Sequence, residues 1–228
     1  MSDEKKSKKA LGLLIVIILI AVVAWYFRDK IPLLPSSAKK VATISVQHNA
    51  VGDSLENTMK ETKELFENNK YEESAKLLRN ISSLLKQGAQ KVDNTADQTI
   101  DATVDKLGKL ADKLDAGTKI EVKELDRSLA SAYLSLALQQ QKKAASLWAE
   151  KKYLAAAGEL KKASQNIKNA GALTGEKVQS GFSIVLEKIK EIVAATVSGT
   201  EKASDRASQQ MKELGNDITQ MWNNIQDE

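Results

Sequence analysis

The chain has 228 residues, of which 42% are hydrophobic and 28% charged, with one histidine and no cysteine. The lack of cysteine excludes disulfides, thiolate metal sites and thiol nucleophiles, and a single histidine excludes metal sites that need two imidazoles from one chain. Most of the formal net charge of +4 comes from the first 30 residues, and the remainder is close to neutral. We therefore expect no binding of nucleic acid, which requires a basic surface.

Residues 10–27 form an uninterrupted apolar run, ALGLLIVIILIAVVAWYF, which follows a short basic tail at residues 1–9. A helix of that length covers about 27 Å, close to the ~30 Å hydrocarbon core of a bilayer. The run ends in Trp25, Tyr26 and Phe27 before a basic residue, and aromatic rings beside a cation are typical of the membrane interface. The sequence therefore predicts a single transmembrane helix that contacts the lipid bilayer through residues 10–27.

The orientation and processing of this segment have alternatives. Basic residues are equally frequent in residues 1–9 and in residues 28–40, so the positive-inside rule is nearly balanced. We expect the N-terminus in the cytoplasm, because its lysines are dense and nothing long has to cross first, and the helical body on the extracytoplasmic side. The basic tail and the small residues Val22, Val23 and Ala24 also suit a cleaved signal peptide. The apolar run continues past that point into aromatic residues, which favours an uncleaved anchor.

Both prolines of the chain, Pro32 and Pro35, fall in residues 28–40, where they predict a stiff juxtamembrane linker. Beyond them, apolar residues recur at steps of three and four, the spacing of one face of a helix. The sequence thus predicts an all-α fold, in which the transmembrane helix is followed by an elongated antiparallel helical bundle. We expect a first helical hairpin with a long extension at 41–117, a second hairpin at 118–173 and one long heptad-like helix at 174–228.

The two predicted hairpins are related in sequence. Seven residues of the first recur with the same spacing in the second: Leu65, Lys70, Tyr71, Ala75, Leu78, Ser82 and Lys86 match Leu147, Lys152, Tyr153, Ala157, Leu160, Ser164 and Lys168. The segments ENNKYEESAKLLRNI and AEKKYLAAAGELKKA each resemble the turn and second helix of a tetratricopeptide hairpin, in which an aromatic residue past the turn packs on the first helix. The chain lacks that family's period of about 34 residues and its closing proline. The resemblance therefore implies the hairpin and not a groove-lining array.

Residues 92–114 carry a further apolar stripe, which we expect to extend the second helix of the first hairpin until Gly117 ends it. On this helix, residues Asp93, Asp97, Asp101 and Asp105 lie four apart and would form one acidic ridge. A cation site is one interpretation, but calcium sites need oxygen ligands wrapped around the ion by a loop. We interpret the ridge as a solvated face.

The most regular helical pattern lies at the C-terminus. Thr174 suits an N-cap with Glu176 in the first turn, and apolar residues step by three and four from Val178 to Ile225, with a break in phase near Gly199. So long a stripe needs a partner surface. It either folds back along the earlier helices, which we favour, or pairs with the same helix of another copy.

No constellation in the sequence points to a reaction. His48 has no acidic residue nearby, no glycine-rich phosphate loop is present, and Tyr71, Tyr153, Trp148 and Trp222 fit turn or core packing. We therefore predict no catalytic, cofactor-binding or metal-binding residues.

The predicted function is that of a single-pass membrane-anchored helical scaffold or interaction protein without catalytic activity. Its partner would be another protein, or a second copy of the chain, bound through helical surfaces. An alternative is a helical cell-envelope protein that protects against stress or binds a ligand, and that is released if the N-terminal segment is cleaved. A third possibility is an enzyme that uses only carboxylates, lysine, serine or tyrosine.

Overall fold

The computed structural model describes residues 54–92, 98–174, 176–198 and 201–226. Its contacts divide the chain into two units, Met1–His48 and Asn49–Glu228, and all described residues belong to the second. The predicted basic tail, anchor helix and linker, together with His48, therefore lie outside the described residues. Within the part of the chain that is described, no helix is both long and apolar enough to cross a membrane.

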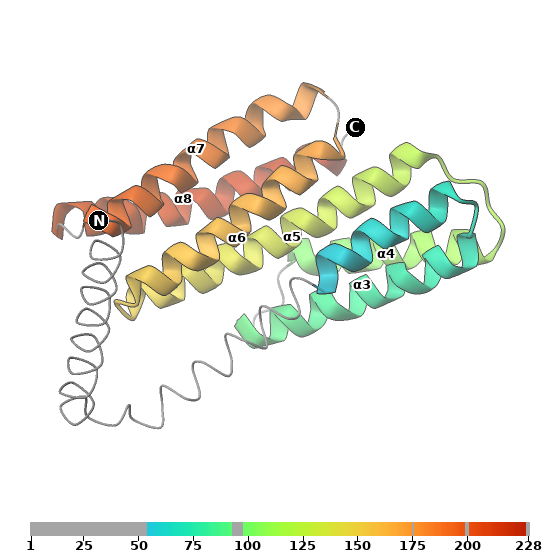
Figure 1. The fold of residues 1–228 in the computed structure, drawn as a ribbon, viewed down its shortest axis with the longest axis horizontal. Helices are drawn as coiled ribbons and strands as arrows, with labels where there is room; N and C mark the ends of the chain where they lie inside the picture. Colours follow the sequence, from blue (N-terminus) through green and yellow to red (C-terminus); the bar gives the residue numbers. More distant parts are fainter. Residues whose placement is uncertain (1–53, 93–97, 175, 199–200, 227–228) are drawn as a thin grey trace, which may run out of the picture. The chain divides into compact units, whose positions relative to one another are not determined.

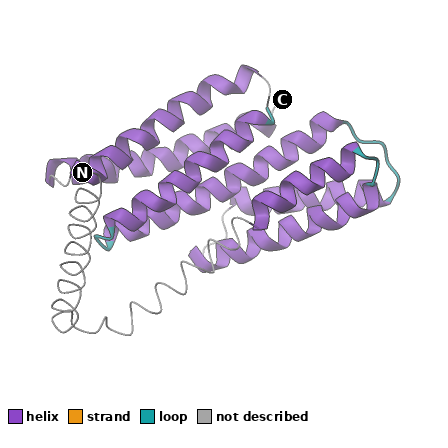
Figure 2. Ribbon diagram, viewed as in Figure 1, coloured by secondary structure: helices purple, strands orange, loops and turns teal. Residues whose placement is uncertain are grey.

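Every regular element among the described residues is an α-helix, which confirms the predicted all-α fold and the helical bundle (Figure 2). A helix over residues 54–67 comes first. The helices that follow, shown in Figure 1, are α3 (Tyr71–Val92), α4 (Gln98–Asp115), α5 (Val122–Ala149), α6 (Tyr153–Ala172), α7 (Glu176–Ser198) and α8 (Glu201–Gln226).

Helix α5 lies at the centre of the bundle. It packs against α3, α4, α6 and α8, and every residue from 128 to 141 is buried. A helix covered on all sides requires apolar or small side chains around its whole circumference. Ala132 and Ala137 let neighbouring helices approach closely, while Leu129 and Leu134 fill the space between them.

The extension predicted for residues 92–114 is wrong, because the chain reverses between α3 and α4 and the two helices pack against each other. The guanidinium of Arg79 in α3 lies 2.8 Å from Asp112 and 2.7 Å from Asp115, near the end of α4. A continuous helix would leave the apolar stripe of this segment in water. Folding back buries it, and Leu107 at its centre becomes fully buried.

The single helix predicted over residues 174–228 is also wrong. Two helices, α7 and α8, occupy this segment and pack against each other, and the Lys188 ammonium of α7 lies 2.6 Å from Asp217 of α8. Helix α7 also packs on α6, and α8 on α5. The reversal covers the long stripe within one chain, which is the fold-back arrangement that we favoured, because each half of the stripe finds an apolar neighbour.

Thr174 is not the N-cap of α7, which begins at Glu176. Its hydroxyl instead donates a hydrogen bond of 3.2 Å to the carbonyl of Gly171, in the last turn of α6. The residue therefore helps to end one helix rather than to begin the next, because last-turn carbonyls lack a partner within the helix.

The two related hairpin turns have the same backbone geometry. After the 54–67 helix, Asn69 has a φ of 58°, and the N–H of Lys70 donates to the carbonyl of Leu65 at 2.9 Å. After α5, Lys151 has a φ of 59°, and the N–H of Lys152 donates to the carbonyl of Leu147 at 2.9 Å. Both are Schellman caps, in which a left-handed residue ends the helix. Gly117 ends α4 with the same cap, as predicted, with a φ of 67°.

An aromatic pair closes each of these two turns. The rings of Phe66 and Tyr71 meet edge to face with centroids 5.4 Å apart, and those of Trp148 and Tyr153 do so at 4.8 Å. Edge-to-face contacts are a favoured arrangement of aromatic rings. This is the packing that the resemblance to tetratricopeptide hairpins implies, so the two units match in geometry as well as in sequence.

Candidate functional site

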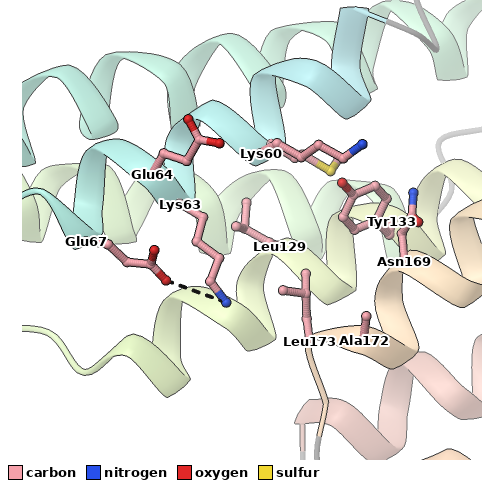
Figure 3. Close-up of a pocket in the computed structure, with 10 residues that line it drawn as sticks. Lys60, Lys63, Glu64, Glu67, Leu129, Tyr133, Asn169, Ala172 and Leu173 are labelled. Atoms are coloured by element: carbon pink, nitrogen blue, oxygen red, sulfur yellow. Dashed lines mark ion pairs between the residues drawn. The ribbon is translucent and has the colours of Figure 1, made fainter.

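A cleft of about 280 Å³ lies between the 54–67 helix, α5 and the end of α6 (Figure 3). The lining includes three pairs of residues four apart, one pair from each helix or its cap, and the members of a pair therefore lie on one helical face. These residues are Met59 and Lys63 from the first helix, Leu129 and Tyr133 from α5, and Asn169 and Leu173 from α6. The cleft is thus built by packing the 54–67 helix against the distant hairpin of α5 and α6.

The base of the cleft is apolar. Met59 and Leu129 are each 1% exposed, and Tyr133 is 4% exposed, so these side chains form a fixed part of the core. Ala172 and the partly buried Leu173 continue the apolar wall toward solvent. An apolar body can therefore be desolvated against this surface.

Charged residues of the first helix form the rim. The ammonium of Lys63 lies 2.7 Å from Asp126 of α5 and 4.0 Å from Glu67, and the ammonium of Lys60 lies 2.8 Å from Glu56. Figure 3 marks the pair of Lys63 with Glu67. Glu64 lines the cleft as well and has no ion-pair partner within the described residues. Both lysines of the rim are therefore neutralised, and the surplus charge is negative.

One side-chain nitrogen beside the cleft lacks an acceptor. The side-chain nitrogen Nδ2 of Asn169 is buried without a hydrogen-bond partner, although its Oδ1 accepts a hydrogen bond of 3.0 Å from Gln165. The hydroxyl of Tyr133 makes no hydrogen bond with any described residue. Buried donors are nearly always paired in folded proteins. The buried Nδ2 of Asn169 is therefore an exception to this rule.

Burial raises the pKa of the Tyr133 hydroxyl to about 12, and the negative charge of Glu56 adds to the rise. The phenol loses its hydration when buried, which penalises the charged phenolate. Tyr133 therefore stays protonated at physiological pH and keeps a proton that it can donate.

The cleft combines an apolar base with charged side chains at its rim. Both of its lysines pair with carboxylates, and none of its described lining residues is a nucleophile hydrogen-bonded to a base. Among the described residues, no group of three or more His, Cys, Asp or Glu side chains is arranged to hold a metal ion.

The residues singled out from the sequence lie elsewhere in the bundle. The indole N–H of Trp222 in α8 donates to the Thr103 hydroxyl of α4 at 2.8 Å, so Trp222 has a structural contact. In the acidic ridge, Asp105 pairs with Lys109 at 2.6 Å and Asp101 is exposed. Asp93 and Asp97 lie outside the described residues. None of these residues lines the cleft.

Sequence reasoning missed the three consecutive glutamines at the middle of α5, each of which bonds to a different helix. The side-chain amide of Gln139 donates to the Leu85 carbonyl of α3 at 3.0 Å, and that of Gln141 donates to the Met211 carbonyl of α8 at 2.6 Å. Gln140 accepts a hydrogen bond of 2.9 Å from Asn166 of α6. Successive helical residues point about 100° apart. In the sequence, the only sign of these bonds is a run of three consecutive polar residues after a stretch of mostly apolar and small residues in α5.

A scan against protein-family models finds no match, and searches of curated proteins and of solved structures find no protein that matches this chain. Its function is therefore argued from its own residues and their geometry.

Proposed function

We propose that the protein is a single-pass membrane-anchored helical scaffold, which holds a protein partner at the bilayer surface without catalysing a reaction. The observation that carries this proposal is the charge-free run at residues 10–27, which is long enough to span the hydrocarbon core. The dense lysines of residues 1–9 favour a cytoplasmic N-terminus and an extracytoplasmic body.

The described bundle supports the scaffold role because its apolar stripes face a core within the chain. That leaves the outer helical faces available for a partner. Leu154 on α6 is 81% exposed and Ile184 on α7 is 66% exposed. Single exposed apolar residues are common on protein surfaces. Among the described side chains of α6 and α7, these two are the large apolar residues most exposed to a partner.

Membrane fractionation tests the anchor. The full chain should stay with membranes through carbonate and high-salt washing, because burial of residues 10–27 far outweighs electrostatic attachment. A variant without residues 10–27 should be released and serves as the control. Release of the full chain by the wash would overturn the membrane proposal.

Co-purification in mild detergent tests the interaction role. A partner that is retained by the full chain should be lost when Leu154 and Ile184 are both replaced by lysine, with the circular dichroism spectrum unchanged. Retention of the same partner by that variant would mean that α6 and α7 do not bind it through these side chains.

A second candidate function is that of a cell-envelope ligand-binding protein released by signal cleavage, and the cleft beside the 54–67 helix favours it. The mass of the mature N-terminus separates the two proposals. A chain that begins near Trp25 supports the released form, whereas an intact Met1 or Ser2 supports the anchored one.

A further inference from the structure

We infer that Lys106 of α4 and Arg127 of α5 form a binding site for a phosphate monoester, next to the end of α8. The two cations come from different helices, and the packing of the bundle brings them together. The inference goes beyond both proposed functions. It concerns only described residues, so it applies equally to an anchored or a released chain.

Hydrogen bonds through Gln226 place the two cations at one seam between α4, α5 and α8. The ammonium of Lys106 donates to Oε1 of Gln226 at 2.7 Å, and Nε2 of Gln226 donates to the Ser131 hydroxyl at 2.8 Å. That hydroxyl also lies 2.8 Å from the carbonyl of Arg127, one helical turn earlier. Residues four apart share a helical face, so Arg127 lies on the face of α5 that carries these bonds.

The guanidinium of Arg127 has no hydrogen-bond or ion-pair partner within the described residues. Its Nε atom is buried, so the side chain lies against the bundle instead of extending into water. The residue as a whole is only partly buried, and its two terminal nitrogens remain open to solvent. A guanidinium offers paired N–H groups in a plane, which suits two oxygens of one phosphate.

The acidic residues closest to the two cations in the sequence are engaged by other lysines. Within three positions of either cation, each carboxylate has such a partner: Asp105 pairs with Lys109 at 2.6 Å, Glu124 with Lys113 at 2.6 Å and Asp126 with Lys63 at 2.7 Å. Lys106 itself bonds only to a neutral amide. The seam therefore carries two positive charges without a described carboxylate at ion-pair distance.

The doubly charged ligand follows from the two charges of the seam. Burial lowers the pKa of Lys106, and the positive charge of Arg127 lowers it further, while Glu124 acts in the opposite direction. Two like charges partly removed from water repel each other. An anion between them replaces this repulsion with attraction. A phosphate monoester carries close to two negative charges at neutral pH, so it balances both cations.

Isothermal titration calorimetry on the full chain in a neutral detergent tests the inference. The probes are methyl phosphate, dimethyl phosphate, which has one negative charge fewer, and succinate, which carries two carboxylates. We expect saturable binding of methyl phosphate at one site per chain. The other two probes should bind at least roughly tenfold more weakly, because one lacks a charge and the other separates its charges along a chain.

Two variants locate the site, and a third is the matched control. Arg127→Gln and Lys106→Gln should each raise the dissociation constant of methyl phosphate at least roughly tenfold, because each removes a charge-assisted hydrogen bond. Lys109→Gln removes a lysine of the same helix that already pairs with Asp105, and it should change the constant by less than about twofold.

Mixed micelles with phosphatidate, a lipid whose headgroup is a phosphate monoester, distinguish the two sources of this group. Loss of the methyl phosphate signal in these micelles would assign the site to a lipid headgroup. An unchanged signal would assign it to a soluble phosphate ester. Both results support a phosphate site.

Three results would overturn the proposal. The ligand class is wrong if methyl phosphate shows no saturable binding, or if succinate or dimethyl phosphate binds as tightly. The site is wrong if Arg127→Gln and Lys106→Gln both leave the affinity unchanged. If binding is seen only in a variant with Asp227→Asn and Glu228→Gln, the acidic residues that follow Gln226 occupy the site instead. None of these results bears on membrane retention, so failure here and failure of the anchor are distinguishable.

Discussion

Glycines in two outer helices make room for the glutamines of α5. A Cβ atom placed on Gly88 of α3 would lie 2.4 Å from the side-chain oxygen of Gln139, and one on Gly215 of α8 would lie 3.1 Å from that of Gln141. Each glutamine can then donate to a backbone carbonyl on the same neighbouring helix. A polar side chain that must meet one particular carbonyl sets the position of one helix along another, because an unpaired buried amide is costly.

We expect Gly88→Ala to lower the free energy of unfolding by roughly 1–3 kcal/mol, because the added methyl group displaces Gln139 from its hydrogen bond. Gly108→Ala is the matched control, since a Cβ there meets no atom within 4 Å. Gly108→Ala should raise the free energy of unfolding by about 0.5–1 kcal/mol through helix propensity alone. Urea unfolding followed by circular dichroism measures both, and a stabilising effect of Gly88→Ala would contradict the packing described for Gln139.

The buried phenol of Tyr133 makes stability depend on alkaline pH. Its pKa is raised to about 12 in the folded chain, whereas an unfolded tyrosine ionises near pH ~10. Between these values the unfolded state loses its proton first, so this group's contribution to stability is full below pH ~10 and falls as the pH rises toward 12. Tyr133→Phe should remove this part of the decline. Equal alkaline slopes in urea unfolding of the two proteins would contradict the assigned burial.

At the scale of the elements, the same cap ends three helices with three different residues in the left-handed region. Asn69, Lys151 and Gly117 have φ values of 58°, 59° and 67°. Glycine adopts this region without strain and asparagine tolerates it, whereas a lysine pays a steric cost. The second hairpin turn is therefore the most strained of the three.

Lys151→Gly should accordingly stabilise the protein by about 1 kcal/mol. Asn69→Gly should gain less, because asparagine suits this conformation better and its Oδ1 also accepts the hydroxyl of Tyr71 at 2.7 Å. Gly117→Ala, the reverse change, should destabilise by about 1 kcal/mol. The midpoint of thermal unfolding should rise most in Lys151→Gly, rise less in Asn69→Gly and fall in Gly117→Ala. A loss of stability in Lys151→Gly would show that the turn at Lys151 is not strained.

The helices and their turns were predictable from the sequence, but two of the reversals were not. Steps of three and four predicted helices, and the repeated tyrosine after each turn predicted the two related hairpins. The reversals before Gln98 and after Ser198 lack proline, and an apolar stripe has the same spacing whether the chain continues or folds back. Long-range pairs such as Arg79 with Asp112 accompany the reversal, and no local pattern contains them.

The cleft was not predictable for the same reason. Met59, Tyr133 and Asn169 each occupy ordinary helical positions, and only the packing of three helices brings them to one cavity. The unpaired state of the Asn169 nitrogen is a property of its surroundings rather than of its residue type. A sequence shows that Asn169 can donate, but not that its nitrogen lacks an acceptor.

At the scale of the whole bundle, polar bonds tie the C-terminal helix to the middle of the chain. The Thr103 hydroxyl accepts the indole N–H of Trp222 and lies 2.8 Å from the Thr99 carbonyl and 2.8 Å from the Ser135 hydroxyl. Since Thr103 has one proton and donates it to the carbonyl, Ser135 must donate to Thr103. One network thus joins α4, α5 and α8, and Gln226 adds a second bond between α8 and α5 at Ser131.

The apolar stripes of the helical body pack against one another within one copy of the chain. Crosslinking tests it directly, because the chain has no cysteine of its own. Lys188→Cys and Asp217→Cys replace an ion pair of 2.6 Å between α7 and α8, and a short bismaleimide can join them in the full chain in mild detergent. The single variant Lys188→Cys is the control for contacts between copies. We predict an internally linked monomer for the double variant, whatever the protein concentration. A covalent dimer as its main product would contradict the account and assign the C-terminal stripe to self-association.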